Sequence, residues 1–158
     1  MKEKAKKATP VNKNPFKQLE DFLDLYLGQK APALPDNFKE TIVNLAPWLI
    51  IIMVVLASPA ILAVLGIGAF LAPFTFFGGV RYGATFNLYL LLLAVSLVLE
   101  ILAIPGLFKK TAQAWHLVFY ANLVNAVSSL SHGNIGNLII GTGLSLYVLF
   151  QVKKYYTK

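Results

Sequence analysis

A long run without any charged side chain, residues 44–77, is the feature that most limits what this chain can fold into. Its central part, residues 49–65, is almost entirely Leu, Ile, Val, Ala and Met. About 20 such residues are enough for a helix to cross the hydrocarbon core of a bilayer. The run therefore predicts a membrane-spanning helix.

Three further apolar segments follow, at about residues 85–104, 112–130 and 135–152. The whole chain is 57% hydrophobic and 13% charged, whereas about 25% of the residues of a soluble domain are charged. So few charges could not cover the apolar surface of a water-soluble fold of this size. The sequence predicts an all-α fold, an integral membrane four-helix bundle with its four spans in residues 47–152.

The distribution of lysines indicates how the bundle is oriented. If the N-terminus is cytoplasmic, the cytoplasmic segments are residues 1–44, 105–111 and 153–158. These segments hold 13 of the 14 Lys and Arg residues, and only Arg81 falls outside. Positive residues flanking spans are concentrated on the cytoplasmic side of membrane proteins. We therefore expect both termini in the cytoplasm and the cell membrane as the location.

The two ends of the chain are basic. Residues 1–15 contain five lysines, two prolines and one glutamate, a composition that predicts a disordered basic arm. The arm either remains in solvent as a topology determinant or contacts anionic lipid. Nucleic-acid binding is not expected, because no aromatic or arginine pattern accompanies the lysines. Residues 153–158 are predicted to form a basic cytoplasmic tail.

Residues 16–46 are predicted to form cytoplasmic amphipathic and juxtamembrane helices. Apolar side chains recur at the helical period in residues 16–27, and the opposite face is mainly acidic. Gly28 then predicts a helix end. Helices that lie on membranes usually carry a basic polar face, so docking on a protein surface is favoured, either this protein's own inner face or a partner's. A second helix should lead into the first span, with Pro47 as a kink or a new start.

The charge-free run is too long for one straight span. Its 34 residues would extend about 50 Å as a helix, against about 30 Å for the hydrocarbon core. We expect a kink at Pro59, with the Ser58 hydroxyl bonding a freed carbonyl. Residues 66–83, with five glycines and four phenylalanines, form either an outer loop at the interface or a re-entrant segment that lines a pathway.

Glu100 lies within the second span and is the only acidic residue after Glu40. An ionisable group at this depth is a functional candidate. In an antiparallel hairpin, His116 of the third span should lie at a similar depth, with Tyr120 nearby. The predicted Glu100–His116 pair either relays protons or is a helix-pairing contact, and Glu100 can alternatively extend to water at the inner face.

The third span is the most polar of the four and carries polar residues on two faces, so it should lie at the centre of the bundle. Such residues either bond neighbouring helices or line a narrow polar path. The predicted intramembrane polar site consists of Glu100, His116, Tyr120, Asn122 and Asn125.

The fourth span presents Asn137, Gly141 and Ser145 at four-residue steps. Small residues at this spacing allow two helices to approach closely. We interpret them as a helix-packing face, used either within the bundle or between copies of the chain.

The search for catalytic and cofactor motifs gives no candidates. The chain has no cysteine, and its two histidines lie near opposite ends of one span. No phosphate-binding loop is present, so neither an enzyme nor a cofactor is expected. The leading hypothesis is an anchoring, assembly or accessory protein, acting through its N-terminal helix and arm on a protein partner or as a homo-oligomer in the lipid bilayer. The alternative is a small transporter or channel component that uses Glu100 and His116.

Overall fold

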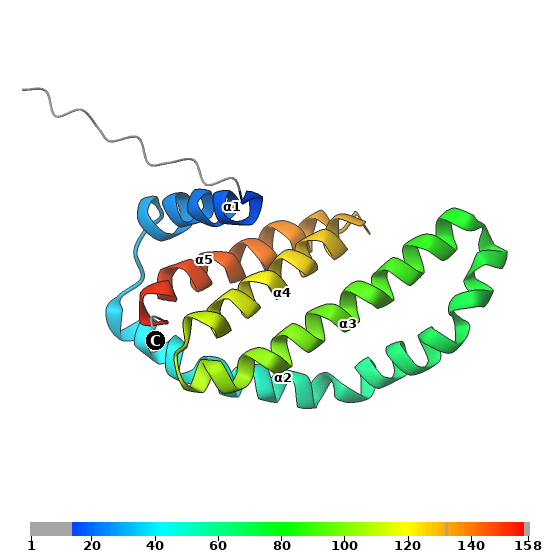
Figure 1. The fold of residues 1–158 in the computed structure, drawn as a ribbon, viewed down its shortest axis with the longest axis horizontal. Coiled ribbons are helices and arrows are strands. Elements are labelled where there is room, and N and C mark those ends of the chain that lie inside the picture. The colour runs from blue at the N-terminus through cyan, green and yellow to red at the C-terminus, as the bar shows by residue number, and fades with distance from the viewer. Residues whose placement is uncertain (1–13, 132, 157–158) are drawn as a thin grey trace, which may run out of the picture.

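The structure, a computed structural model, describes residues 14–131 and 133–156, without the side chains of Ala57, Ala60 and Asn137. Helices make up all regular elements of these residues, which confirms the predicted all-α class (Figure 1). In chain order they are α1 (Pro15–Leu23), η1 (Asp24–Lys30), α2 (Asp36–Leu71), η2 (Ala72–Gly78), α3 (Val80–Phe108), α4 (Ala112–Ser131), η3 (Asn137–Thr142), α5 (Gly143–Val152) and η4 (Lys153–Tyr155). The predicted basic arm lies almost entirely outside the described residues.

Three of the described helical segments are long and apolar enough to cross a membrane: Asp36–Leu56, Ile61–Gly78 and Val80–Phe108. The first two belong to α2 and η2, and the third is α3. α4 is less apolar because amide, hydroxyl and imidazole side chains interrupt it. The π-helix η3 and α5 join without a break, so residues 135–152 form one helical segment.

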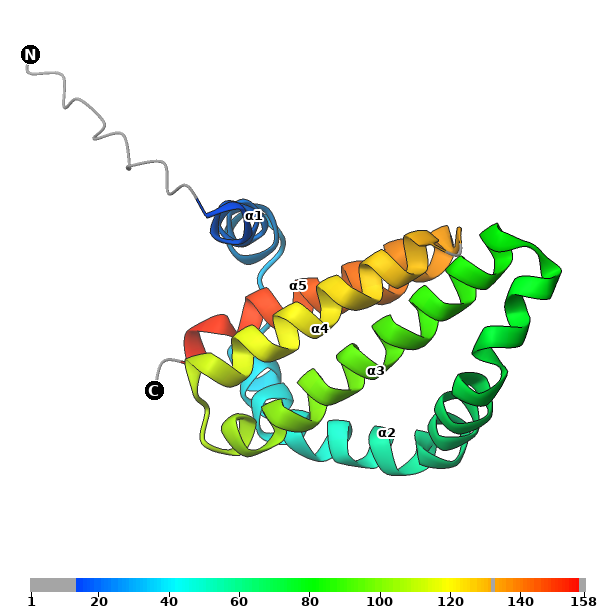
Figure 2. The same cartoon turned by 45° about the vertical axis from the view of Figure 1, so that its right-hand side comes forward.

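A bend in α2 divides this long helix into two parts (Figure 2). Its 36 residues would span about 54 Å if straight. Pro59 has no N–H to donate to the carbonyl of Val55, and the Ser58 hydroxyl donates to that oxygen instead, at 2.7 Å. The predicted kink chemistry is confirmed. Pro47, in contrast, lies inside α2 without ending it.

Residues 66–83, predicted to form an outer loop or a re-entrant segment, are helical except for one residue. α2 continues to Leu71, the 3-10 helix η2 follows, and Gly79 is the single residue between η2 and α3 outside the helices. Its φ of 107° is a left-handed conformation that glycine adopts without strain. The chain therefore passes from η2 into α3 through one glycine, and the aromatic segment before it is a 3-10 helix.

Asn87 of α3 fastens η2 to α3, an interaction that the sequence analysis did not find. Its Nδ2 donates to the carbonyl oxygens of Gly83 at 2.7 Å and Ala72 at 3.3 Å. The Phe76 ring packs on Gly83 so closely that an added Cβ would lie 2.6 Å from the ring. Gly83 thus makes room for an aromatic side chain where η2 meets α3.

Helices α3, α4 and α5 run alongside one another, and their best-packed part is at one end (Figure 1). We call this end, where α2 and α4 begin and α3 and α5 finish, the inner end. It contains the main buried cluster: Val43, Ala103, Leu107, Ala114, Trp115, Phe119, Leu146, Leu149, Phe150, Val152 and Tyr156. The opposite end, with η2, is the outer end.

Trp115 is the centre of the buried cluster. Its indole Nε1 donates to the carbonyl of Leu149 at 2.9 Å, and its ring stacks on Phe119 at 5.5 Å between centroids. The ring also meets Phe150 edge-on at 5.2 Å. α4 is therefore tied to α5 by both a hydrogen bond and aromatic packing, as its predicted central position requires.

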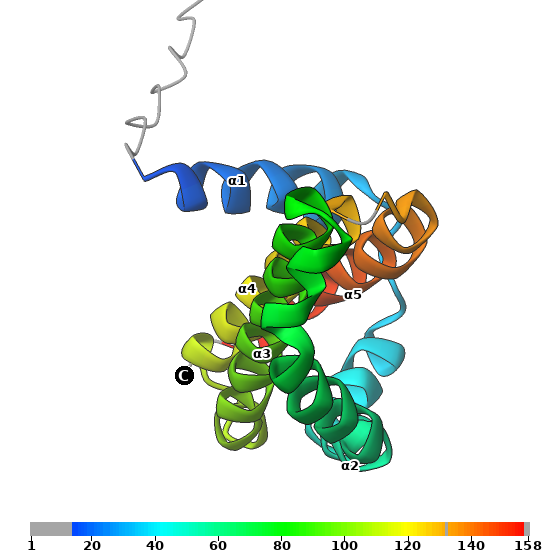
Figure 3. The same ribbon diagram turned by 90° about the vertical axis from the view of Figure 1, so that its right-hand side faces the viewer.

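The N-terminal helix α1 crosses α4 and α5 on the side away from α2 and α3. Figure 2 views α1 nearly along its axis while α4 and α5 run across the picture, and Figure 3 shows α1 extended over them. The predicted helix end at Gly28 is wrong, because the π-helix η1 continues through it to Lys30. A Cβ at Gly28 would lie 3.0 Å from Asp24 Oδ1, a tight contact, and 3.8 Å from the carbonyl oxygen of Phe150 in α5, an ordinary contact distance.

Candidate functional site

Polar side chains from three neighbouring helical segments line a cavity of about 340 Å³. None of the lining residues is charged. The lining consists of Tyr89 and Leu93 from α3, Asn122, Asn125, Ser128 and Ser129 from α4, and Gly141, Thr142 and Ser145 from η3 and α5. Several of these residues were separate candidates in the sequence, and the structure brings them together in one site, which we call the polar cavity.

The α4 wall of the polar cavity follows from helical spacing. Residues 122, 125 and 129 recur at three- and four-residue steps, so they lie on one face of α4. The Asn122 Nδ2 donates to the carbonyl of Val118 in its own helix at 2.9 Å. This bond uses one of the two amide N–H donors of Asn122, and the amide oxygen can accept a hydrogen bond from a ligand.

The opposite wall includes two of the three residues predicted to form a helix-packing face. Gly141 and Ser145 line the polar cavity and are exposed, so within the described chain they are not buried against another helix. Thr142 beside them is buried, at 7% exposure. The side chain of Asn137 lies outside the described part of the chain. Within one chain the small residues therefore provide space for the cavity, and a packing face between copies of the chain stays a prediction.

Glu100 is connected to the polar cavity through one serine. The Ser96 hydroxyl donates to Asn125 Oδ1 at 3.0 Å and lies 3.4 Å from Glu100 Oε1. Glu100 is half-buried and lies one helical turn beyond Ser96, toward the inner end. The only acidic side chain of α3 thus adjoins the cavity without lining it.

The predicted pairing of Glu100 with His116 is wrong, because each residue has a different partner. His116 Nε2 lies 3.5 Å from Glu20 Oε2 of α1, and His116 Nδ1 lies 2.7 Å from the carbonyl of Ala112. The two residues do lie toward the same end, as the hairpin argument required. His116, however, is on the face of α4 that is turned to α1, while Asn125 is on the face turned to α3.

Tyr120 also belongs to the α1 side of α4. Its ring meets Phe16 edge-on at 6.1 Å and lies 6.4 Å from the His116 ring. The five residues of the predicted polar site are therefore divided by α4: Glu100, Asn122 and Asn125 at the polar cavity, and His116 and Tyr120 under α1.

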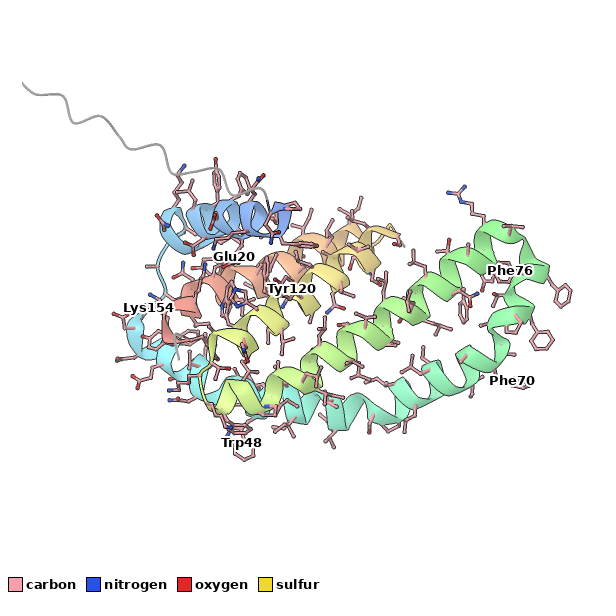
Figure 4. The ribbon with its side chains drawn as sticks, in the orientation of Figure 1. Glu20, Trp48, Phe70, Phe76, Tyr120 and Lys154 are labelled. Carbon is pink, nitrogen blue, oxygen red and sulfur yellow. The ribbon has the colours of Figure 1, made fainter. Side chains whose placement is uncertain are left out.

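Ion pairs that were not expected from the sequence hold α1 in place. Lys153 Nζ lies 3.0 Å from Glu20 Oε1 and 3.6 Å from Asp24 Oδ1, and 5.0 Å from the centre of the Trp115 ring. Figure 4 shows Glu20 on the side of α1 that is turned toward α4 and α5. The acidic face of the amphipathic helix therefore docks on this protein's own surface, one of the two alternatives that the sequence left open.

A second ion-pair group joins the start of α2 to the end of the chain. Asp36 Oδ1 lies 3.1 Å from Lys154 Nζ and 3.4 Å from Lys39 Nζ. The hydrogen bond and charge of Lys154, with a smaller effect of Lys39, hold the pKa of the Asp36 carboxyl below its usual value. Tyr156 is buried, and burial raises the pKa of its hydroxyl. Up to Tyr156, the predicted basic tail is thus part of the packed inner end.

Gln151 connects the segment between η1 and α2 to α5. Its Nε2 donates to the carbonyl of Leu27 at 2.8 Å, and its Oε1 accepts from the N–H of Leu34 at 3.3 Å. The available signal was an amide side chain at position 151, in the apolar last turns of the final predicted span. Among residues 14–131 and 133–156, no three His, Asp or Glu side chains are grouped so that they could hold a metal ion.

No known family model matches the sequence, and it has no significant similarity to a curated protein or to a solved structure. The fold and the site alone define the class: an all-helical protein with three apolar segments long enough to cross a membrane and a polar cavity between its helices.

Proposed function

We propose that this chain is a multi-pass membrane protein whose polar cavity binds a small polar solute, acting as a small transporter or as a component of a channel. The observation that carries the proposal is the lining of the cavity by hydroxyl and amide groups from α3, α4 and α5 together. Polar groups placed between apolar helices are costly in a bilayer and mark solute pathways in membrane proteins. Pockets with several converging polar groups are the usual binding sites.

The proposed topology has four spans, α2 from Pro47 onward, α3, α4 and residues 135–152, with the segments before Pro47 and both termini in the cytoplasm. α4 has 20 residues and would cover about 30 Å, which matches the hydrocarbon core. Residues 135–152 run alongside α4 as one continuous helical segment. The bend at Pro59 supports the assignment of α2 as a single span, because it shortens the reach of a helix that would otherwise be too long.

Glu100 gives the proposed pathway its direction. A solute that leaves the cavity toward the inner end would pass Ser96 and then the Glu100 carboxylate, which are 3.4 Å apart. The hydroxyl can donate to or accept from a passing molecule, and the carboxyl group can hold or release a proton. His116 takes no part in this pathway, because its partner is Glu20.

Anchoring or assembly of a protein partner through the N-terminal region is the second candidate function. The exposed aromatic residues Phe16, Phe22 and Tyr26 of α1 and η1 favour it. The acidic face of α1 does not, because Glu20 and Asp24 already pair with Lys153. A partner would therefore bind the aromatic residues or residues 1–13. No enzymatic activity is proposed.

Flux measurements with purified protein in liposomes test the leading proposal. The solutes are ammonium, urea and glycerol, and the variant is Asn125→Leu, which replaces a lining amide by an apolar side chain of similar size. The exposed Asn44→Leu variant is the matched control. We expect flux of at least one solute with the wild type and the control, and a loss with Asn125→Leu. Flux equal to that of empty liposomes, or equal in all three proteins, would refute the proposal.

The second candidate predicts a different result. Removal of residues 1–13 should abolish the co-purification of a specific protein from native membranes and leave solute flux unchanged. If no protein depends on those residues or on Phe22, anchoring through this region is excluded.

A further inference from the structure

An acidic side chain of the amphipathic helix α1 faces the protein, whereas its aromatic side chains face outward. The side chain of Glu20 is only 12% exposed because it faces Lys153 and His116. Phe16 and Phe22, in contrast, are each 57% exposed, and Tyr26 of η1 is 46% exposed. The carboxylates of Glu20 and Asp24 are thus turned inward together with the apolar side chains that pack on the buried cluster, and the aromatic side chains are turned outward.

The outward surface of α1 and η1 itself has two flanks. Leu19, Phe22 and Tyr26 follow one another at helical spacing, and Phe22 and Tyr26 are in contact at 4.7 Å between ring centroids. We call these three residues the aromatic flank. Lys17 and Asp21, also at helical spacing and exposed, form the charged flank. Lys30 lies at the end of the aromatic flank, 4.5 Å from the centre of the Tyr26 ring.

The position of α1 along the bundle fixes its depth in the proposed topology. α1 contacts α4 at His116 and Tyr120, one to two turns from the start of α4, or about 6–12 Å along its axis. Since α1 crosses α4 and α5 (Figures 2 and 3), it would run parallel to the membrane surface when those helices cross the bilayer. This depth lies in the outer part of the cytoplasmic leaflet, where interfacial helices bury their apolar faces by about 5–10 Å.

We propose that the aromatic flank of α1 and η1 binds the lipid of the cytoplasmic leaflet, so that α1 is an interfacial helix held against the bundle by ion pairs. Aromatic rings and lysines are the side chains that favour this depth. The Phe16 ring continues the surface of Tyr120, which is itself 38% exposed on α4. One surface of aromatic groups thus extends from a spanning helix onto α1.

The ion pairs explain how an acidic helix can lie at a membrane. A carboxylate that faced anionic lipid would be repelled, which is why the acidic sequence alone favoured a protein surface. The Glu20 carboxylate pairs with Lys153 and His116, and the Asp24 carboxylate also pairs with Lys153. Both carboxylates are therefore turned away from the lipid. The same ion pairs orient α1 so that the aromatic flank faces away from the protein. Lipid is favoured over a protein partner because the flank lies beside the apolar spans at the depth of the interface.

The absence of cysteine allows a direct test in the full chain. A nitroxide spin label is attached to Phe22→Cys on the aromatic flank and, as the matched control, to Asp21→Cys on the charged flank. The labelled proteins are placed in liposomes of neutral and anionic phospholipid. Collisions of the label with oxygen, which concentrates in lipid, and with a water-soluble nickel complex are then compared.

We expect the ratio of oxygen to nickel accessibility to be severalfold higher at position 22 than at position 21. Equal ratios would place the aromatic flank in water and overturn the proposal. Low accessibility of position 22 to both reagents would show a protein surface over it, which also overturns the proposal and supports the second candidate function. Because Phe22 is exposed, the label should not disturb folding, and Tyr26→Cys provides an independent position on the same flank.

Discussion

The inner and outer ends of the molecule have similar apolar sequences but opposite degrees of burial. At the inner end, Trp115 and Phe119 are each 1% exposed. In the outer half of α2 and in η2, Leu62 is 70%, Phe70 is 73% and Phe77 is 89% exposed. Figure 4 shows Phe70 directed away from the bundle. An apolar sequence thus does not by itself specify a protein core.

The two ends differ in burial because they differ in the polar interactions that surround their apolar residues. The inner end has groups that fix geometry, such as the Trp115–Leu149 hydrogen bond and the Lys153 ion pairs. At the outer end, one asparagine, Asn87, holds η2. The inner end should therefore be stable by its own packing, whereas the outer half depends on lipid to cover its side chains. Four substitutions, from the largest expected effect to the smallest, test this contrast.

Replacing the buried tryptophan should have the largest effect. Trp115→Ala removes a buried ring and leaves the Leu149 carbonyl without its donor, so we expect a loss of about 3–5 kcal/mol of unfolding free energy. Trp48, which is 55% exposed, is the only other tryptophan and provides the control Trp48→Ala. Denaturation in detergent, followed by circular dichroism, measures both. Equal losses would show that the inner end is not the stable core.

Adding a single methyl group at the outer end should destabilise the protein. Gly83→Ala places a Cβ 2.6 Å from the Phe76 ring, and the required displacement should destabilise the protein by about 1–2 kcal/mol. Gly66→Ala is the control, since a Cβ there meets nothing within 4 Å. In a helix interior this exchange is favourable by up to about 1 kcal/mol. A thermal unfolding shift of the same sign in both variants would contradict the packing of η2 on α3.

Releasing α1 from the rest of the protein should lower the unfolding free energy by less than either Trp115→Ala or Gly83→Ala. Lys153→Ala leaves Glu20 and Asp24 without their common partner, and the side chain of Lys153 is already 32% exposed. We expect a loss of about 1 kcal/mol and faster backbone hydrogen exchange in α1. Lys17→Ala, a substitution on the charged flank, should leave exchange unchanged. If α1 exchanges equally in both, Lys153 does not hold it.

The smallest effect is expected at acid pH. The pKa of Asp36 is lowered by Lys154 and Lys39, so this group stabilises the fold above its ordinary pKa and loses that contribution as the pH falls through the lowered value. Asp36→Asn should flatten this part of the stability profile below about pH 4. Because Asp36 is exposed, the change should also weaken in high salt. An unaltered acid profile in the variant would rule out the contribution.

The sequence was sufficient for features that depend on neighbouring residues along the chain. The helical class, the Ser58–Pro59 bend and the two polar faces of α4 all follow from local spacing. The partner of His116 did not, because depth along a hairpin gives no information on which way a helix is rotated. That rotation is set by Asn125 bonding Ser96 on one side and by α1 on the other.

Other features were missed because they depend on contacts between distant residues. The polar cavity required Tyr89, Asn122 and Ser145 to converge from three helices, and single-helix patterns suggested a packing face instead. Residues 66–83, which include η2, were interpreted as a loop or a re-entrant segment because of their many glycines and phenylalanines. The one available signal was Asn87, a lone amide in an apolar helix, and its role follows from the carbonyls of Ala72 and Gly83.

The bend of α2 has a mechanical consequence. Since Ser58 satisfies the carbonyl of Val55 from within the same helix, neither water nor another helix is needed at the kink. The angle there can widen or narrow without exposing a bare acceptor to hydrocarbon. In the proposed topology, α2 would straighten in a thicker bilayer and fold further in a thinner one, so the chain would suit membranes of different width.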